Sequence, residues 1–377
     1  MTFLHSGPGR ALLDFAKQAR QKGHVVTIAA TAHFDNFRSE SLLIEEAHAA
    51  GIEIILCDDL YTRDFNAISH SAKTLEKGLA KVRYDLIHSQ AAIPGFAAAL
   101  ACKNVYGNLL PHISTVHGWA PNKLPWMKLQ DVFFLNNVDR VLAVSNDVRQ
   151  YLIDEGVKAK KIKTVYNGCD FMRLDKLSKL DKLAQEEVIP KSKKWRIGTL
   201  AYLSKRKCLN HLIEAIAHLP LPIRQELEVV IIGEGEERPF LEKMIGELNL
   251  QDTVCLIGGQ KNPFPWLNSF DLFVLPSLSE GLSVALVEAA YFIRPIVTTK
   301  VQGNREIGKK IFAALVPPND PKALAKAIAR QLLKGPDPDK LLQAKAWVEN
   351  RFSQDMHFKQ MEALYSQLLT TFSGSVG

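Results

Sequence analysis

The chain has 377 residues, with 47 Lys and Arg against 40 Asp and Glu, which leaves a formal net charge of +7 at pH 7. This length suffices for two domains, and 47% hydrophobic with 23% charged residues argues against extensive disorder. The five cysteines lie far apart, without CxxC spacing or a histidine at metal-ligand distance. This pattern argues against a disulfide framework and a structural zinc site, and it favours a reducing compartment.

Neither a signal peptide nor a membrane span is predicted. Residues 1–9 lack a basic segment and an apolar run, and the longest apolar stretch, 91–102, is interrupted by Pro94 and Gly95. We therefore expect a cytoplasmic protein, with a peripheral contact on the inner face of the membrane as an open alternative. The positive charge favours anionic partners, but no nucleic-acid-binding motif accompanies it, so we expect no nucleic acid partner.

In the first half of the chain, short apolar runs alternate with amphipathic segments. Expected helices include 11–21, 41–50 and 124–136. Buried strands alternating with helices predict a parallel sheet covered on both faces. The expected strands are 25–30, 52–57, 86–89, 113–117, 140–145 and 163–166.

A polar, charged segment, 171–194, precedes a second alternation of the same kind. The whole pattern predicts an α/β fold of two Rossmann-like, doubly wound domains that face each other across a cleft, the default ligand site. The predicted parts are an N-terminal domain (1–170), an interdomain segment with one short helix (171–194), a C-terminal domain (195–340) and a helical tail that packs back on the first domain (341–377). Expected strands of the second domain are 195–200, 227–232, 253–257, 272–275, 295–298 and 312–316, and expected helices are 209–218, 236–248, 282–292 and 321–333.

The strongest candidate site follows the strand 272–275. Gly281 allows the backbone to approach a ligand closely, and the free N–H groups of Leu282 and Ser283 open a helix, where a phosphate is favoured. Glu280 and Glu288 lie on the same side of that helix, so they suit a ligand with sugar hydroxyls on both sides of a diphosphate. The alternative is an ordinary helix start with a capping Glu280 and a solvated Glu288, and the spacing does not choose between the two.

A second phosphate candidate is the cationic run Lys205, Arg206 and Lys207, which follows the strand 195–200. The carboxyl end of a parallel strand is where α/β proteins bind ligands, and lysine serves phosphate as a point charge. A solvated loop is the alternative. The run gains weight because it recurs opposite the segment 280–283 in the same domain.

In the first domain, Gly7 and Gly9 precede a helix, and His117 ends a strand next to Gly118. Both places are suited to ligand contact, although each motif alone is weak. Residues 233–235 form a glycine turn but not the full dinucleotide fingerprint, which disfavours a nicotinamide oxidoreductase. Neither a GxSxG motif nor a Walker A motif is present.

Taken in order, these segments resemble glycosyltransferase family 4, a family of retaining, sugar-nucleotide-dependent enzymes of the GT-B fold. The resemblance covers nearly the whole chain, and Glu280 and Glu288, with seven residues between them, resemble the family's E-x7-E signature. The other matching segments are 7–9, 12–16, 23–26, 115–118, 139–145, 165–170, 197–207, 233–235 and 271–277.

The resemblance implies a role for each candidate residue. Glu288 would bind the ribose, Glu280 would lie beside the donor sugar, and Lys207 would neutralise the phosphates, while His117 would contact the sugar. Thus His117, Glu280 and Lys207 are the expected catalytic residues. The expected donor-binding residues are Gly7, Gly9, Lys205, Arg206, Gly281, Leu282, Ser283 and Glu288.

The resemblance also implies the partners. We expect a nucleotide-sugar donor, UDP-linked by preference, and a glycan or lipid-linked saccharide acceptor, as in bacterial polysaccharide or lipopolysaccharide biosynthesis. No cofactor and no dedicated metal are expected, since cations and a helix terminus can stabilise the departing nucleoside diphosphate.

Two departures from the family keep a second hypothesis open. Tyr202 stands where the family commonly has a phosphate-binding arginine, and only six residues precede Gly7. Lys205 or Arg206 can replace the missing charge. Otherwise the chain is a catalytically impaired GT-B protein that acts as a binding or scaffold subunit.

The acceptor side is expected in the first domain, where Trp119, Trp126 and the segment 122–136 offer aromatic and amphipathic surface. With Lys123 and Lys128, this segment suits a lipid-linked acceptor at a membrane surface. The competing interpretation, which apolar helix faces favour in general, is a helix packed on its own sheet.

Overall fold

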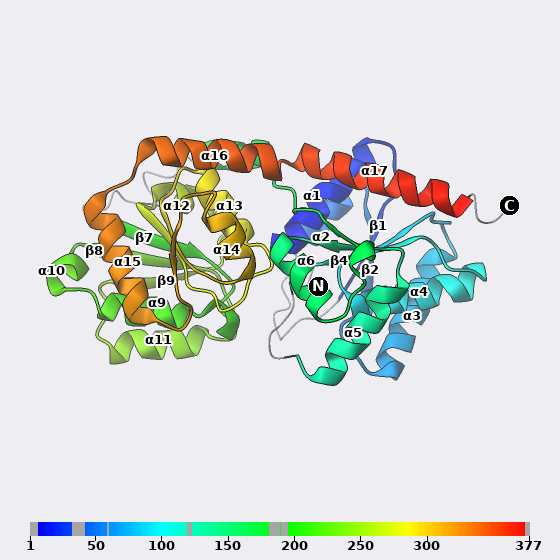
Figure 1. The fold of residues 1–377 in the computed structure, drawn as a ribbon, viewed down its shortest axis with the longest axis horizontal. Coiled ribbons are helices and arrows are strands. Elements are labelled where there is room, and N and C mark those ends of the chain that lie inside the picture. The colour runs from blue at the N-terminus through cyan, green and yellow to red at the C-terminus, as the bar shows by residue number, and fades with distance from the viewer. Residues whose placement is uncertain are drawn as a thin grey trace. The chain divides into compact units, whose positions relative to one another are not determined.

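The computed structural model describes residues 7–31, 42–58, 60–118, 123–180, 189 and 195–373. The chain divides into two compact units, which are drawn as ribbons in Figure 1. Unit 1 comprises Met1–Cys169 and Gln354–Gly377, and unit 2 comprises Asp170–Ser353.

The strands of unit 1 are all parallel where they pair. Strand β1 (Thr27–Thr31) pairs with β2 (Glu53–Cys57), and a second sheet has the order β3-β4-β5-β6. The strands of this second sheet are β3 (Ile87–Ser89), β4 (His112–Val116), β5 (Arg140–Ala143) and β6 (Ile162–Thr164). Every expected strand of the first domain is present, since each apolar run forms a strand, although Glu53 and Leu56 of β2 are exposed.

Helices surround these sheets. The C-terminal helix packs on the first helix, where Phe358, Met361 and Leu364 share a buried cluster with Phe15 and Ala19. The helices of unit 1 are α1 (Gly7–Gln21), α2 (Leu42–Ala49), α3 (Phe65–Leu79), α4 (Ala92–Tyr106), α5 (Pro125–Asn137), α6 (Asn146–Asp154), the 3-10 turn η1 (Ala159–Lys161) and α17 (Gln354–Ser373). Among the residues that the structure describes, no helix is both long enough and apolar enough to cross a membrane.

Helix α5 has apolar residues on two faces. One face is buried, through Phe134 and Leu135, and packs on α4 where Gly95 leaves room for the Phe134 ring. On the other face Trp126, Leu129 and Phe133 are exposed. The interpretation of this segment as a helix packed on its own sheet therefore accounts for one face only. Trp119, the other aromatic residue considered there, lies outside the described residues.

Unit 2 contains a single six-stranded parallel sheet with the order β12-β11-β10-β7-β8-β9. The expected strands of the second domain are again all present. They are β7 (Trp195–Leu200), β8 (Leu227–Ile232), β9 (Val254–Gly258), β10 (Leu272–Leu275), β11 (Ile296–Thr299) and β12 (Ala314–Val316). The strands after β7 are added in the order β8, β9 towards one edge of the sheet, whereas the strands after β10 are added in the order β11, β12 towards the opposite edge. The topological switch point therefore lies between β7 and β10.

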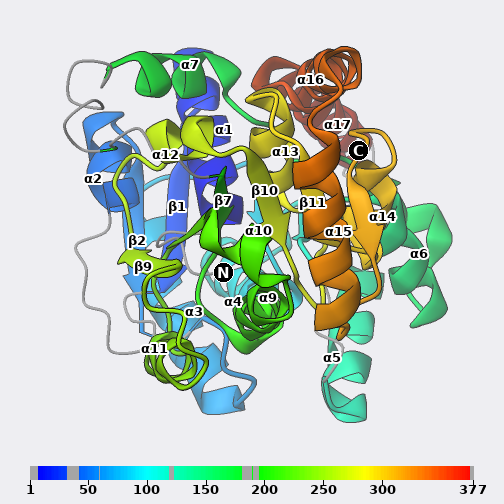
Figure 2. The ribbon, with the colours of Figure 1, turned by 90° about the vertical axis from the view of Figure 1, so that its left-hand side faces the viewer.

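Helices cover both faces of this sheet, as Figure 2 shows. One face carries α9 (Leu209–Ala217), α11 (Arg238–Glu247) and α15 (Pro321–Lys334), whose leucines and isoleucines form one core with alternate strand residues. The remaining elements of unit 2 are α7 (Phe171–Leu180), the 3-10 turn η2 (Lys205–Lys207), α10 (Leu221–Gln225), α12 (Phe264–Ser269), α13 (Val284–Tyr291), α14 (Gln302–Gly308) and α16 (Pro338–Phe352).

The division into units differs from the predicted domains in two places. Helix α7, expected in an interdomain segment, is anchored in unit 2, where Tyr291 donates a hydrogen bond to Asp175 and Asn262 donates one to the Leu177 carbonyl. Residues 181–188 and 190–194 of that segment lie outside the described residues. The tail does not pack back as a whole, because α16 packs on α13 and only α17 joins unit 1. The helices part at Ser353, whose extended backbone ends α16.

Candidate functional site

One candidate site lies at the switch point of unit 2. Strands β7 and β10 are hydrogen-bonded neighbours, with Leu272 in register with Ile197. The loop after β7 carries Lys205, Arg206 and Lys207, and the loop after β10 leads to Glu280 and α13. The loops are also joined directly, since the N–H of Leu278 donates to the Arg206 carbonyl over 2.9 Å. The fold thus brings the two candidate phosphate segments together.

Glu280 is the centre of this arrangement. Its carboxylate is buried, and the Lys207 ammonium donates to Oε1 over 2.5 Å, while the Ser277 hydroxyl donates to the same oxygen over 2.7 Å. The other oxygen, Oε2, accepts from Arg206 Nη1 over 3.1 Å. Arg206 also donates to the Ser279 carbonyl over 2.7 Å. Both carboxylate oxygens are therefore engaged by side chains of the two loops.

The charge state of Glu280 follows from these contacts. Burial acts to raise the pKa of Glu280, but the nearby Lys207 and Arg206 charges and the hydrogen bonds from Lys207 and Ser277 outweigh it, so the pKa is lowered. The group is an ionised carboxylate that holds two cations. The cluster as a whole carries one excess positive charge.

The start of α13 lies next to this cluster. Ser283 is the N-cap, and its hydroxyl accepts from the Leu286 N–H. The preceding turn is fixed from α14, because the Gly303 N–H donates to the Glu280 carbonyl over 3.1 Å and a side chain at Gly303 would collide with the Gly281 backbone. Glu288 lies half-buried on α13, whereas Glu280 stands in the loop before the first residue of this helix, Val284, so the two carboxylates do not share one side of a helix as their spacing predicted.

The rest of the cationic loop takes other positions. Lys205 is exposed, and Tyr202 is 38% exposed. The glycine turn at 233–235 lies against this loop, since a Cβ atom at Gly233 would collide with the Ala201 carbonyl and a Cβ atom at Gly235 would collide with the Leu203 backbone. These glycines are explained by backbone packing, so the turn gives no support to dinucleotide binding.

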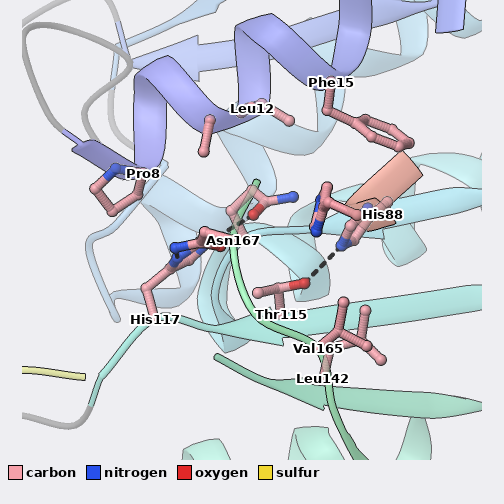
Figure 3. A pocket seen from close by; sticks show the side chains of 12 residues that line it. Pro8, Leu12, Phe15, His88, Thr115, His117, Leu142, Val165 and Asn167 are labelled. Atoms are coloured by element: carbon pink, nitrogen blue, oxygen red, sulfur yellow. Dashed lines mark hydrogen bonds between the residues drawn. The ribbon is translucent and has the colours of Figure 1, made fainter. Parts of the chain in front are cut away.

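A separate candidate site is a pocket in unit 1 at the carboxyl ends of β3, β4 and β6. Figure 3 shows side chains of α1 over His88, His117 and Asn167, which project from the loops and strands below. The pocket combines an apolar wall with amide and imidazole groups. Its lining residues are Pro8, Ala11, Leu12, Phe15, His88, Gln90, Thr115, His117, Leu142, Val165, Asn167 and His357.

His117 follows β4 and is fixed from both sides in the pocket. Its Nε2 lies 2.7 Å from Oε1 of Gln90, and its Nδ1 lies 3.5 Å from Nδ2 of Asn167. These partners favour a neutral ring that donates from Nε2 and accepts at Nδ1. Burial, with a smaller effect from nearby His357, lowers the pKa of His117 to about 3. The imidazole is therefore neutral at pH 7.

A second histidine lies deeper. His88 Nε2 is 2.7 Å from the Thr115 hydroxyl, and Nδ1 is 2.7 Å from the hydroxyl of Tyr365 on α17. Burial lowers the pKa of His88 to about 3, with smaller effects from the neighbouring histidines. His357, also on α17, lies 2.8 Å from the Tyr166 carbonyl through Nδ1.

The sequence interpretation found some of these residues and missed others. Gly7 and Gly9 form the first turn of α1 itself rather than a turn before it, and their neighbour Pro8 lines the pocket. Gln90 and Asn167 were not singled out as site residues, although each follows a predicted strand. Ser277 was also missed, although it lies only three residues before Glu280. His357 and Tyr365 of α17 were missed because only the folded chain brings them next to the pocket of unit 1.

Within the described part of the chain, no group of three or more His, Cys, Asp or Glu side chains could hold a metal ion.

Two family models match the chain in adjoining halves. The model described as Glycosyltransferase Family 4 matches residues 5–173, and that described as Glycosyl transferases group 1 matches residues 181–347.

Curated relatives are matched over part of their length. The N-acetyl-alpha-D-glucosaminyl L-malate synthase of Bacillus anthracis is 26% identical over 59% of this chain and 58% of its own. The UDP-Gal:alpha-D-GlcNAc-diphosphoundecaprenol alpha-1,3-galactosyltransferase of Escherichia coli is 26% identical over 68% of each chain. The matched part of the Bacillus relative is therefore less than two thirds of that protein.

Among solved structures, Anabaena HepE in complex with UDP-glucose is similar over 96% of each chain, with a TM-score of 0.78 and 20% identity. This likeness concerns the fold, and it extends over both Rossmann-like units. With the two family models covering both halves of the sequence, the chain belongs to the family 4 glycosyltransferases and has the GT-B fold.

Proposed function

We propose that the chain is a retaining glycosyltransferase that transfers a sugar from a nucleotide-sugar, of the UDP-linked class, to a glycan or a lipid-linked saccharide. The observation that carries the proposal is the cluster of Lys207 and Arg206 on the buried Glu280, beside the start of α13. It lies at the switch point of unit 2, where α/β sheets bind ligands.

The cluster suits a diphosphate for electrostatic reasons. Two cations against one carboxylate leave an excess positive charge, and the start of α13 adds the positive end of the helix dipole. Charge that develops on a departing nucleoside diphosphate would be stabilised by groups that are already in place. Because Glu280 already holds the Lys207 ammonium group, Lys207 would need little reorganisation to stabilise the diphosphate.

Tyr202 stands where the family commonly has a phosphate-binding arginine, and Arg206 is our candidate for the residue that supplies this positive charge instead. Its guanidinium reaches Glu280 and the Ser279 carbonyl, next to the segment 281–283, although 47% of the Arg206 side chain is exposed. A loss of nucleoside diphosphate affinity in Arg206→Met, with a smaller loss in Lys205→Met, would support this assignment.

Glu280 and Glu288 do not suit the acid–base pair of a glycosidase. A general acid needs a raised pKa, and the pKa of Glu280 is lowered by its cationic partners. We assign Glu280 to holding Lys207 and Arg206 beside the donor, and Glu288 to the ribose. Retention of the anomeric configuration would then come from attack on the same face that the nucleotide leaves.

The relatives support the choice of donor and acceptor. The Escherichia coli relative is named for a UDP-galactose donor and a diphosphoundecaprenol-linked acceptor, and HepE was solved with UDP-glucose. We therefore assign the donor to the UDP-sugars. The neutral His117, which lines the pocket of unit 1, would contact the sugar.

A panel of UDP- and GDP-sugars, with and without lipid-linked saccharide acceptors, tests the proposal. We expect one UDP-sugar to be consumed, and NMR of the product to show the α-anomer from an α-linked donor. An inverted product would refute retention. Tight nucleotide binding without turnover on any donor would instead favour the catalytically impaired alternative.

A further inference from the structure

The exposed face of α5 is an apolar feature of unit 1 that packing of the core does not explain. Leu124 is 52% exposed, Trp126 51%, Leu129 71% and Phe133 66%. Trp126, Leu129 and Phe133 follow one another at helical spacings of three and four residues, so they form one stripe. The opposite face of the same helix is already buried against the unit, so the exposed stripe does not serve the core.

Basic side chains lie at the C-terminal end of this stripe. Asn136 of α5 donates to the Gly156 carbonyl, and the Lys158 N–H donates back to Asn136 Oδ1 over 2.8 Å. Lys161 donates to the Val138 carbonyl, the C-cap of α5. The loop that carries these lysines is therefore attached to the helix end, one turn from Phe133.

These cations are in excess over nearby acids. Lys123, just before α5, and Lys128 on α5 are matched by Asp131 and Glu155. By contrast, the segment 158–161 holds three lysines and no acidic residue. Burial lowers the pKa of Lys161, and Lys158 and Lys160 lower it further, although Asp139 acts in the opposite direction. We call Lys158, Lys160, Lys161 and Arg140 the basic cluster.

We propose that the α5 stripe and the basic cluster together dock unit 1 on an anionic phospholipid surface. Trp, Leu and Phe side chains in one helical stripe would enter the interfacial layer, with the helix lying in the plane of the membrane. The basic cluster, at the end of the same helix, would meet the lipid phosphates. An anionic surface fits this combination better than a second copy of this chain, whose own basic cluster would repel the first.

The inference extends the proposed function, in which the acceptor is lipid-linked, but its test needs no turnover. The measurement is co-sedimentation of the full chain with phosphatidylcholine vesicles, with and without phosphatidylglycerol. We expect binding to the phosphatidylglycerol vesicles, weakened by salt.

Two variants, each with a control, test whether the α5 stripe and the basic cluster bind the vesicles. The triple variant Trp126→Gln, Leu129→Gln and Phe133→Gln should lower the vesicle partition coefficient by roughly tenfold or more. The control replaces three exposed apolar residues of unit 2, Phe240, Leu333 and Leu342, by Gln and should bind as the unmodified chain does. The pair Lys158→Glu and Lys160→Glu should remove the preference for phosphatidylglycerol, whereas Lys322→Glu with Lys326→Glu on α15 should not. Circular dichroism confirms that each variant is folded.

Several results would overturn the proposal. The α5 variant could bind vesicles as well as its control does, or the unmodified chain could bind none. Sedimentation velocity without lipid could show a dimer that the α5 variant abolishes, in which case the stripe is an interface between copies. UDP binding is measured in parallel and should be the same in the α5 variant, so that failure of docking is separable from failure of the donor site.

Discussion

The ammonium group of Lys207 lies 2.5 Å from Oε1 of Glu280, although the two residues are 73 positions apart. Lys207 ends the 3-10 turn η2 after β7, and Glu280 stands in the loop between β10 and α13. Because β7 and β10 are neighbours at the switch point, this pair connects the two loops on which the proposed donor site is built.

The pair should be energetically coupled. We expect Lys207→Met and Glu280→Gln each to lower the free energy of unfolding, and the double variant to lose less than the sum, with a coupling of about 1–3 kcal/mol. Urea titrations of the four proteins give this value. If the losses in free energy of unfolding are additive, the contact between Lys207 and Glu280 contributes nothing to stability. Lys207→Arg, which keeps the charge, serves as the conservative control.

Glu288 should matter for the nucleoside rather than for stability. If its carboxylate binds the ribose hydroxyls, Glu288→Ala removes hydrogen bonds to a charged group and should weaken UDP binding roughly 10- to 100-fold. Glu247→Ala, an exposed carboxylate on α11 of the same unit, is the control. Equal affinities for the two variants would remove Glu288 from the site.

His117 should affect transfer more than nucleotide binding, because its pocket lies in unit 1 and the phosphate cluster in unit 2. His117→Ala should lower kcat roughly 10- to 100-fold with little change in UDP affinity. Gln90→Ala, which frees the ring but leaves it present, should give a smaller loss. Steady-state kinetics on the active donor decide this, and an unchanged kcat in His117→Ala would contradict the role.

Stability should fall with acidification because of buried neutral histidines. The pKa is lowered from 6.5 to about 3 for His88 and His117, and to about 4 for His112, chiefly by burial. Below pH 6.5 the unfolded chain binds protons that the folded chain does not, so stability is retained above pH 6.5 and lost as the pH falls from there, towards about 4 for His112 and about 3 for His88 and His117. The loss is about 1.4 kcal/mol per pH unit for each histidine.

Urea titrations at several pH values check this slope. His88→Gln should make the loss of stability below pH 6.5 less steep, while His218→Gln, at an exposed position of unit 2, should leave it unchanged. The same slope in His88→Gln as in the unmodified chain would contradict the assignment.

Much of the fold was predictable because buried parallel strands appear as short apolar runs. The tail was not, because its apolar stripe continues from α16 to α17 and does not reveal that the helices pack on different units on either side of Ser353. Helix α4 was also missed, since Pro94 and Gly95 suggest a break. Pro94 stands in the first turn, where no N–H partner is lost, and Gly95 makes room for Phe134.

The candidate site, too, could be predicted from the sequence only in part. Spacing placed Glu280, Glu288 and the cationic loop in one domain, since strand ends gather at one edge of a sheet. It could not predict that Glu280 would hold Lys207 and Arg206, or that Gln90 and Asn167 would fix His117, because these contacts depend on side-chain packing between distant segments.

The most direct test of the central claim is a calorimetric titration of the folded chain with UDP, and with uridine for comparison. The account predicts one saturable UDP site per chain that is strongly weakened in Lys207→Met, and binding of uridine that is roughly 100-fold weaker or worse because the diphosphate contacts are missing. If no nucleoside diphosphate binds to the folded protein, or if uridine binds as tightly as UDP, the donor site proposed at Lys207, Glu280 and α13 is wrong.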